Sequence, residues 1–226
     1  MRFSWIFLIL FAFGDASANP GGTTSNSTAA VGVAGRCEEP AVAGGGAEGC
    51  YWNTSLPLGR TGPQLYWYID RFADVTLAKA ARTERGAVIV GLGGHVFLQT
   101  VSEDPEWRSQ GGERLGRVGP LAVPRGVELT ARFMEATTSS ASATHPHVHS
   151  GPEGFFLLEG SICVETPAGT HRAGPSGSVV LPGRLPMQLF SPKTVRRSLV
   201  LVVHPTAEPW IDRRPNWKGE GLCEKE

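Results

Sequence analysis

Two histidines and one glutamate close together form the strongest chemical signal in this sequence. They are His147, His149 and Glu153. In an extended segment, side chains two residues apart point to the same face, so the two imidazoles are expected to lie side by side. The intervening Ser150-Gly151-Pro152 favours a turn that can bring Glu153 back beside them. Imidazole nitrogens and carboxylate oxygens bind divalent transition metals, so the pattern predicts a metal site.

Short β-strands surround this cluster. They are separated by turns such as Pro167-Ala168-Gly169 and Pro182-Gly183, and no helical pattern interrupts them. The predicted strands are 127–137, 144–149, 154–158, 161–165, 178–181, 187–190 and 198–204. Many short strands joined by Gly/Pro turns indicate a β-sandwich or barrel, so the fold class is predicted to be mainly β, with the barrel at 125–205.

The preceding region, 50–124, has a mixed pattern. A strand is expected at 65–72 and an alanine-rich helix at 73–84. Two β-rich runs, 87–92 and 95–101, flank a glycine pair and predict a hairpin. We therefore expect an α+β extension without a catalytic cluster.

The ends of the chain carry different signals. Residues 1–18 resemble a signal peptide: an apolar run too short to span a bilayer leads to Ala16-Ser17-Ala18, the small-x-small form of a cleavage site. We expect a secreted or periplasmic protein with no membrane span after cleavage. Residues 19–49 are rich in Gly, Ala and Ser and predict a flexible leader, whereas 206–226 predicts a tail that docks its tryptophans on the barrel.

Charge and motif content exclude several functions. The chain has 21 basic and 21 acidic residues, which gives no reason to expect nucleic acid or an anionic membrane as partner. A nucleophile elbow, a phosphate-binding loop and a Cys-x-x-Cys pair are all missing from the sequence. Serine hydrolase, nucleotide hydrolase and thioredoxin-like activities are therefore set aside.

The four cysteines of an exported chain could form disulfides in three connectivities. Cys163 lies within an expected strand, where a buried free thiol is the simplest interpretation. Cys37, Cys50 and Cys223 lie in irregular flanks. We expect Cys50 to pair with Cys223 or with Cys37.

Together with Gly160, the cluster resembles the first motif of the cupin superfamily, H-x-H-x3-E-x6-G. Ala141 replaces the glycine expected before the first histidine. The run 177–186 resembles the second motif, and Met187 stands where the last histidine ligand would be. The resemblance covers roughly 125–205 and implies a small jelly-roll barrel, the double-stranded β-helix, of a quercetinase-like, single-cupin type.

This resemblance implies a metal held inside the barrel by His147, His149 and Glu153. Two histidines and one carboxylate are similar to the ligand set of non-haem Fe(II) oxygenases, so Fe(II) is preferred, with Mn, Ni, Cu or Zn as alternatives. Met187 is expected to pack as a cavity wall; as a fourth ligand, its thioether would favour copper.

The resemblance leaves more than one function open. The first is an oxygenase that acts on a small, largely apolar or aromatic molecule with a chelating oxygen. The alternatives are a non-catalytic small-molecule or metal-binding module and a metal-assisted isomerase or decarboxylase. A homodimer is compatible with barrels of this type.

Several other residues are candidates for supporting roles. Phe133, Phe155 and Phe156 are expected to line the cavity, although strand parity will place only some of them inside. His145 would lie about 13 Å from His149 in a regular strand, so we expect it outside the ligand set. His204 ends the last expected strand and is a further candidate for the surroundings of the metal.

Three arginines could also lie around the mouth of the barrel, where they would attract an acidic substrate. They are Arg184, Arg196 and Arg197.

Overall fold

The computed structural model describes residues 31–32, 35–36, 49–91, 94–139, 141–191, 194–213 and 215–224. For residues 31–32, 35–36 and 49–53 it describes the backbone only. The predicted signal peptide at 1–18 and Cys37 lie outside the described residues, as does most of the expected leader at 19–49.

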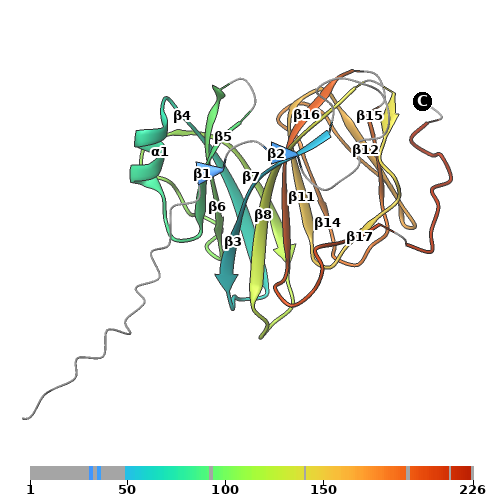
Figure 1. Ribbon diagram of the computed structural model, residues 1–226, viewed down its shortest axis with the longest axis horizontal. Coiled ribbons are helices and arrows are strands. Elements are labelled where there is room, and N and C mark those ends of the chain that lie inside the picture. The colour runs from blue at the N-terminus through green and yellow to red at the C-terminus, as the bar shows by residue number, and fades with distance from the viewer. Residues whose placement is uncertain are drawn as a thin grey trace, which may run out of the picture.

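A six-stranded sheet forms the middle of the molecule, with strand order β14-β11-β16-β8-β3-β2 (Figure 1). Its long neighbours β11, β16, β8 and β3 pair antiparallel in that order. The strands are β2 (Gly35–Arg36), β3 (Gly49–Gly59), β8 (Leu129–Thr138), β11 (Glu153–Glu159), β14 (Ser178–Leu181) and β16 (Arg196–Pro205).

A second sheet and a short ribbon cover one face of the central sheet. The second sheet has the order β13-β12-β15-β9, and the ribbon joins β10 to β17. These strands are β9 (Ser142–Ala143), β10 (Val148–His149), β12 (Ile162–Thr166), β13 (Gly169–Ala173), β15 (Gln188–Ser191) and β17 (Ile211–Asp212). Apolar side chains from both sheets form one core between them, which we call the barrel core. The prediction of a mainly β, jelly-roll fold is therefore confirmed.

A five-stranded sheet, in the order β1-β5-β6-β4-β7, lies with helix α1 on the side of the central sheet away from the barrel core (Figure 1). These elements are β1 (Val31–Gly32), β4 (Gln64–Phe72), α1 (Val75–Ala81), β5 (Gly86–Val90), β6 (Val96–Ser102) and β7 (Glu113–Ala122). Residues such as Trp67, Ile69 and Leu121 pack against Phe133 and Leu201 of the central sheet and form a second core, the outer core.

The central sheet is therefore buried on both faces. Along β11, Phe155 belongs to the barrel core, whereas Phe156 belongs to the outer core. Alternate side chains of a strand point to opposite faces, so β8 likewise places Met134 inside the barrel and Phe133 outside it. The expectation that Phe133 and Phe156 line the cavity was wrong for this reason, and only Phe155 faces the barrel interior.

Some of the elements expected in the segment 50–124 are confirmed, and others differ from the expectation. The expected strand at 65–72 and the hairpin at 87–101 are present as β4, β5 and β6. The expected helix at 73–84 is shorter, because α1 starts after the N-cap Asp74, whose side chain accepts from the backbone N–H of Leu77, and ends at Ala81. Strand β3 pairs with β8 in the central sheet, so the segment 50–124 contributes a strand to the barrel as well as the outer sheet.

The structure places a disulfide between Cys163 on β12 and Cys223 near the C-terminus. The expected free thiol at Cys163 and the pairing of Cys223 with Cys50 were both wrong. The tail crosses the second sheet and brings the two Cα atoms within 5.8 Å, a distance at which a disulfide forms without backbone movement. Glu165, buried two residues along β12, accepts hydrogen bonds from the backbone N–H groups of Glu220 and Leu222 and holds the same stretch of tail.

Candidate metal site

The backbone pairing of short segments positions the three predicted ligands. The backbone of His147 exchanges two hydrogen bonds with that of Met187, at 3.0 and 2.9 Å. His149 lies on β10 and pairs with Ile211 of the C-terminal tail. Glu153 is the first residue of β11, so its side chain shares the inward face of that strand with Phe155. The turn at 150–152 thus joins two strands that both present their ligands to the barrel interior.

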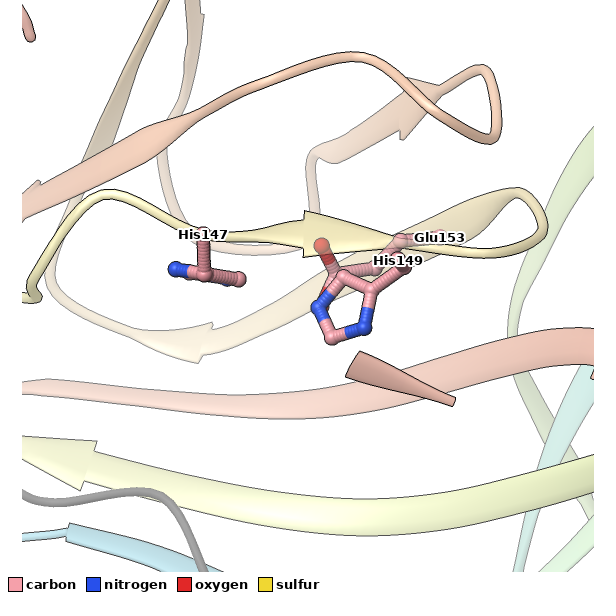
Figure 2. A group of neighbouring side chains, drawn as sticks. All are labelled: His147, His149 and Glu153. Carbon is pink, nitrogen blue, oxygen red and sulfur yellow. The ribbon is translucent and has the colours of Figure 1, made fainter. Parts of the chain in front are cut away.

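The side chains of His147, His149 and Glu153 converge (Figure 2). Each offers one ligand atom, and these atoms lie within 4.8 Å of one another. All three residues are buried, with exposed fractions of 5%, 0% and 3%. The Nε2 atom of His149 lies 3.5 Å from a carboxylate oxygen of Glu153. Two imidazoles and one carboxylate at these separations match the donor set and the span of a divalent metal site.

Backbone carbonyls fix the orientation of both imidazoles. The Nδ1 atom of His147 donates to the carbonyl of His145 at 2.9 Å, and the Nδ1 atom of His149 donates to the carbonyl of Trp210 at 3.0 Å. Each ring therefore keeps its proton on Nδ1 and leaves the lone pair of Nε2 for a ligand. The Nε2 atom of His149 is buried and has no hydrogen-bond partner among the described residues, as expected of a nitrogen that coordinates a metal.

The electrostatics of the site also favour a neutral, metal-binding imidazole at His149. Burial holds the pKa of His149 well below its ordinary value of 6.5, and the nearby His147 lowers it further. The carbonyl of Trp210 raises this pKa, but by less than burial lowers it. Because a protonated imidazole cannot coordinate a metal, this shift keeps His149 in the form that can.

Met187 lies at the site, as the sequence predicted. Its backbone pairs with that of His147 in an antiparallel bridge. The side chains of two residues that are directly opposed in such a bridge project to the same face. Met187 is buried and belongs to the barrel core together with Phe155. These contacts support its assignment as a wall of the site.

The remaining histidines lie outside the ligand group. The side chain of His145 is exposed, and only its carbonyl reaches the site. His204 is buried near the end of β16 on the same face as Val200 and Val202, which belong to the barrel core. It is thus directed into the barrel, but its ring is not part of the three-residue group.

Two residues near the ligands were not predicted as part of the site. The ring of Trp210 stacks on that of His149, with centroids 5.3 Å apart and planes at 21°. The guanidinium carbon of Arg132 lies 4.3 Å from the centroid of the same tryptophan. The sequence indicated that Trp210 would dock, but the partner depends on the path of the tail. For Arg132 the sequence offered one signal. Arg132 lies two residues before Met134 in an expected strand, so the two side chains point to the same face, and Met134 belongs to the barrel core.

Substitution of Gly151 tests the turn that joins the ligands. A Cβ atom on Gly151 would lie 1.8 Å from the backbone carbonyl oxygen of Val203, so Gly151→Ala must displace the turn or β16. We expect a loss of about 2–3 kcal/mol in the free energy of unfolding, together with weaker metal binding. Urea unfolding of the purified variant measures the loss. Gly174→Ala is the matched control, because nothing lies within 4 Å of its Cβ position, and a loss as large there would contradict the steric argument.

His204 predicts a pH dependence of stability. Burial lowers its pKa below 6.5, as does Arg132 to a smaller degree, while the carbonyls of Pro205 and Glu208 and the Glu208 carboxylate act in the opposite direction. With the pKa depressed in the folded state, the unfolded chain takes up the proton first as the pH falls. The contribution to stability is thus present above 6.5 and is lost progressively below it. We expect unfolding free energies to fall between pH 7.5 and 5.5, and to fall less in His204→Gln; an equal fall in both proteins would refute the prediction.

No family model and no curated protein matches the sequence. Among solved structures, the chain is similar to DMSP lyase DddQ from Ruegeria pomeroyi, with a TM-score of 0.35 and 19% identity over 39% of this chain and 45% of the lyase. It also resembles the polyketide cyclase RemF from Streptomyces resistomycificus, with a TM-score of 0.32 and 24% identity over 45% of this chain and 70% of the cyclase.

A cupin-2 domain protein from Shewanella frigidimarina is similar over 38% of this chain and 76% of its own, with a TM-score of 0.29 and 13% identity. Each of these alignments spans less than half of this chain, and less than half of the lyase. The architecture therefore rests on the sheet topology itself. Within the described residues, the single helix α1 is too short to cross a membrane.

Proposed function

We propose that this protein is a metal-dependent oxygenase that acts on a small, largely apolar or aromatic molecule with a chelating oxygen. The observation that supports the proposal is the buried group of His147, His149 and Glu153, in which both imidazoles are oriented by backbone carbonyls. Three protein ligands leave coordination positions open for other molecules, an arrangement used by Fe(II) oxygenases. Fe(II) is the proposed ion, and Mn, Ni, Cu or Zn would fit the same donor atoms.

A divalent ion at this site would supply Lewis-acid and redox chemistry that the side chains lack. The chain itself supplies orientation and shielding. His147 and His149 each donate the Nδ1 proton to a backbone carbonyl, so the Nε2 atom of each ring is directed to the site as a potential ligand. Trp210 stacks over His149 and limits access of water to that ring, which is fully buried.

The walls around the site favour an apolar substrate. Phe155, Met187 and Trp210 belong to the barrel core and lie on the elements that carry or contact the ligands. An aromatic or aliphatic body packed against these side chains would be held by burial of apolar surface, which stabilises by roughly 25 cal/mol per Å². A chelating oxygen would then be the polar part of the substrate.

A second function, a non-catalytic binding module, is favoured by the burial of all three ligands. A metal enclosed in this way could serve stability or sensing without turnover.

Metal analysis and oxygen uptake separate the two functions. The purified protein is loaded with Fe(II) under reducing conditions, its metal content is measured, and oxygen consumption is followed with flavonols, diketones and catechols. The oxygenase proposal predicts one ion per chain and substrate-dependent uptake that is lost in His147→Ala. One ion per chain without uptake on any of these compounds supports the binding module. Absence of stoichiometric metal overturns both.

We also propose that the protein is exported. The disulfide between Cys163 and Cys223 supports this location, because disulfides persist in oxidising compartments. Expression with residues 1–18 intact, followed by fractionation and N-terminal sequencing, tests for cleavage after Ala18.

A further inference from the structure

Arg132 lies in the same row of the central sheet as the metal ligand Glu153. Glu153 pairs with Val202, and Val202 pairs with Arg132 on the next strand. Paired residues in antiparallel strands project their side chains to the same face, and Val202 belongs to the barrel core. Arg132 is therefore directed into the barrel at the same end as the three ligands.

Trp210 links Arg132 to the site. Its ring stacks on His149, and the guanidinium carbon of Arg132 lies 4.3 Å from the centroid of that ring. A cation over an indole face is held in place by the electrostatics of the ring. Arg132 is half-buried, so the residue remains partly accessible to solvent.

The charges at this end of the barrel favour an anionic ligand. Within the group formed by the three ligands, His204 and Arg132, Glu153 is the acidic residue. With a divalent ion bound, this group carries an excess of positive charge, which an anion would offset.

The three arginines that the sequence suggested for this role are engaged elsewhere. Arg184 is exposed and donates to both carboxylate oxygens of Glu208, at 2.8 and 2.6 Å. Arg197 pairs with the buried Glu135. Arg196 is buried and pairs in register with Thr138, at the opposite end of β8 from the row that contains Arg132.

We propose that Arg132 is a substrate-binding residue that holds a carboxylate, and that the substrate is therefore a small aromatic or apolar carboxylic acid. This inference rests on the proposed function, since the metal and the guanidinium would bind the same molecule. The planar guanidinium can donate two parallel hydrogen bonds to a carboxylate, which fixes the orientation of the ligand as well as its charge. The apolar body of the acid would contact the barrel core.

Cobalt-loaded protein provides a test that does not need the natural substrate. Co(II) at the site is monitored by its visible absorption, which changes when a ligand binds nearby. Salicylate and its neutral relative salicylamide are titrated into wild type, Arg132→Gln and Arg132→Lys. We expect Arg132→Gln to weaken salicylate binding about tenfold or more, the loss of one charge-assisted contact. Salicylamide binding should change less than about twofold, and Arg132→Lys should recover part of the salicylate affinity.

Arg184→Gln is the matched control, because it removes an equal charge from the same end of the barrel without removing a side chain directed inward. Salicylate affinity that is unchanged in Arg132→Gln, or reduced equally in Arg184→Gln, overturns the role of Arg132. An equal loss for salicylate and salicylamide also overturns it, since that pattern indicates a structural effect. Failure of the wild type to bind cobalt would overturn the proposed function itself, and cobalt stoichiometry therefore distinguishes the two failures.

Discussion

His149→Ala is expected to lower metal affinity on the order of 100-fold or more and to remove metal-dependent stabilisation. The wild-type residue is fully buried, and its Nε2 atom faces the Glu153 carboxylate at 3.5 Å. A ligand that binds only the folded state at 100 times its Kd stabilises by about 2.7 kcal/mol. For a chain of this size, that corresponds to a rise in Tm of about 5–10 °C, which wild type should show on adding metal and the variant should not.

Thermal unfolding with and without a divalent metal measures this difference. His171→Ala is a suitable control, because His171 lies on strand β13 of the second sheet, outside the ligand group. Its Tm should rise with metal as in wild type. Equal metal-dependent shifts in wild type and His149→Ala would show that the metal binds elsewhere.

Removal of the Cys163–Cys223 disulfide is expected to have the second large effect. The bridge spans a sequence separation of 60 residues, and closing a loop of that length stabilises by about 4 kcal/mol in the chain-entropy model. The double variant Cys163→Ser, Cys223→Ser avoids an unpaired thiol and should lose stability of that order in urea unfolding.

The disulfide variant should also bind metal more weakly, because the tail that it anchors contains Trp210. That residue accepts the Nδ1–H of His149 and stacks on its ring. Glu165→Gln is a graded comparison: it keeps the disulfide and weakens two hydrogen bonds to the tail, with an expected loss of about 1–2 kcal/mol. Unchanged metal affinity in the disulfide variant would mean that the tail does not support the site.

The core of the candidate site could be predicted from sequence because it is local. His147, His149 and Glu153 are joined by a turn and two short extended segments, so their convergence follows from strand parity and turn chemistry. Met187 lies farther along the chain, and the second cupin-like run made its position recognisable. The structure brings it opposite His147 by two backbone hydrogen bonds.

Trp210 and Arg132 could not be predicted in the same way. Both depend on pairings between distant segments: Trp210 on the path of the tail across β10, and Arg132 on the register of β8 with β16. The disulfide partner of Cys163 depends on the same tail. Nothing local in the sequence specifies such long-range geometry.

The fold shows the same division between local and distant information. Most of the short strands at 125–205 have clear turn signals and were predicted, although β9 and β13 were not. Strand β7, which contains Gly116 and Pro120, lacks a continuous apolar run and was not predicted either. The central sheet is buried on both faces, so hydrophobicity alone did not reveal which face of β8 or β11 lines the barrel. Phe133 and Phe156 were misplaced for this reason.

The most direct test of the central claim is a crystal structure of the protein with a bound divalent metal, analysed by anomalous scattering at the absorption edge of that metal. We expect one anomalous peak per chain, bound by Nε2 of His147, Nε2 of His149 and a carboxylate oxygen of Glu153, with ligand distances of about 2.0–2.2 Å. A metal-replete crystal with no peak among these three residues, or with its peak elsewhere, would show that they do not form a metal site.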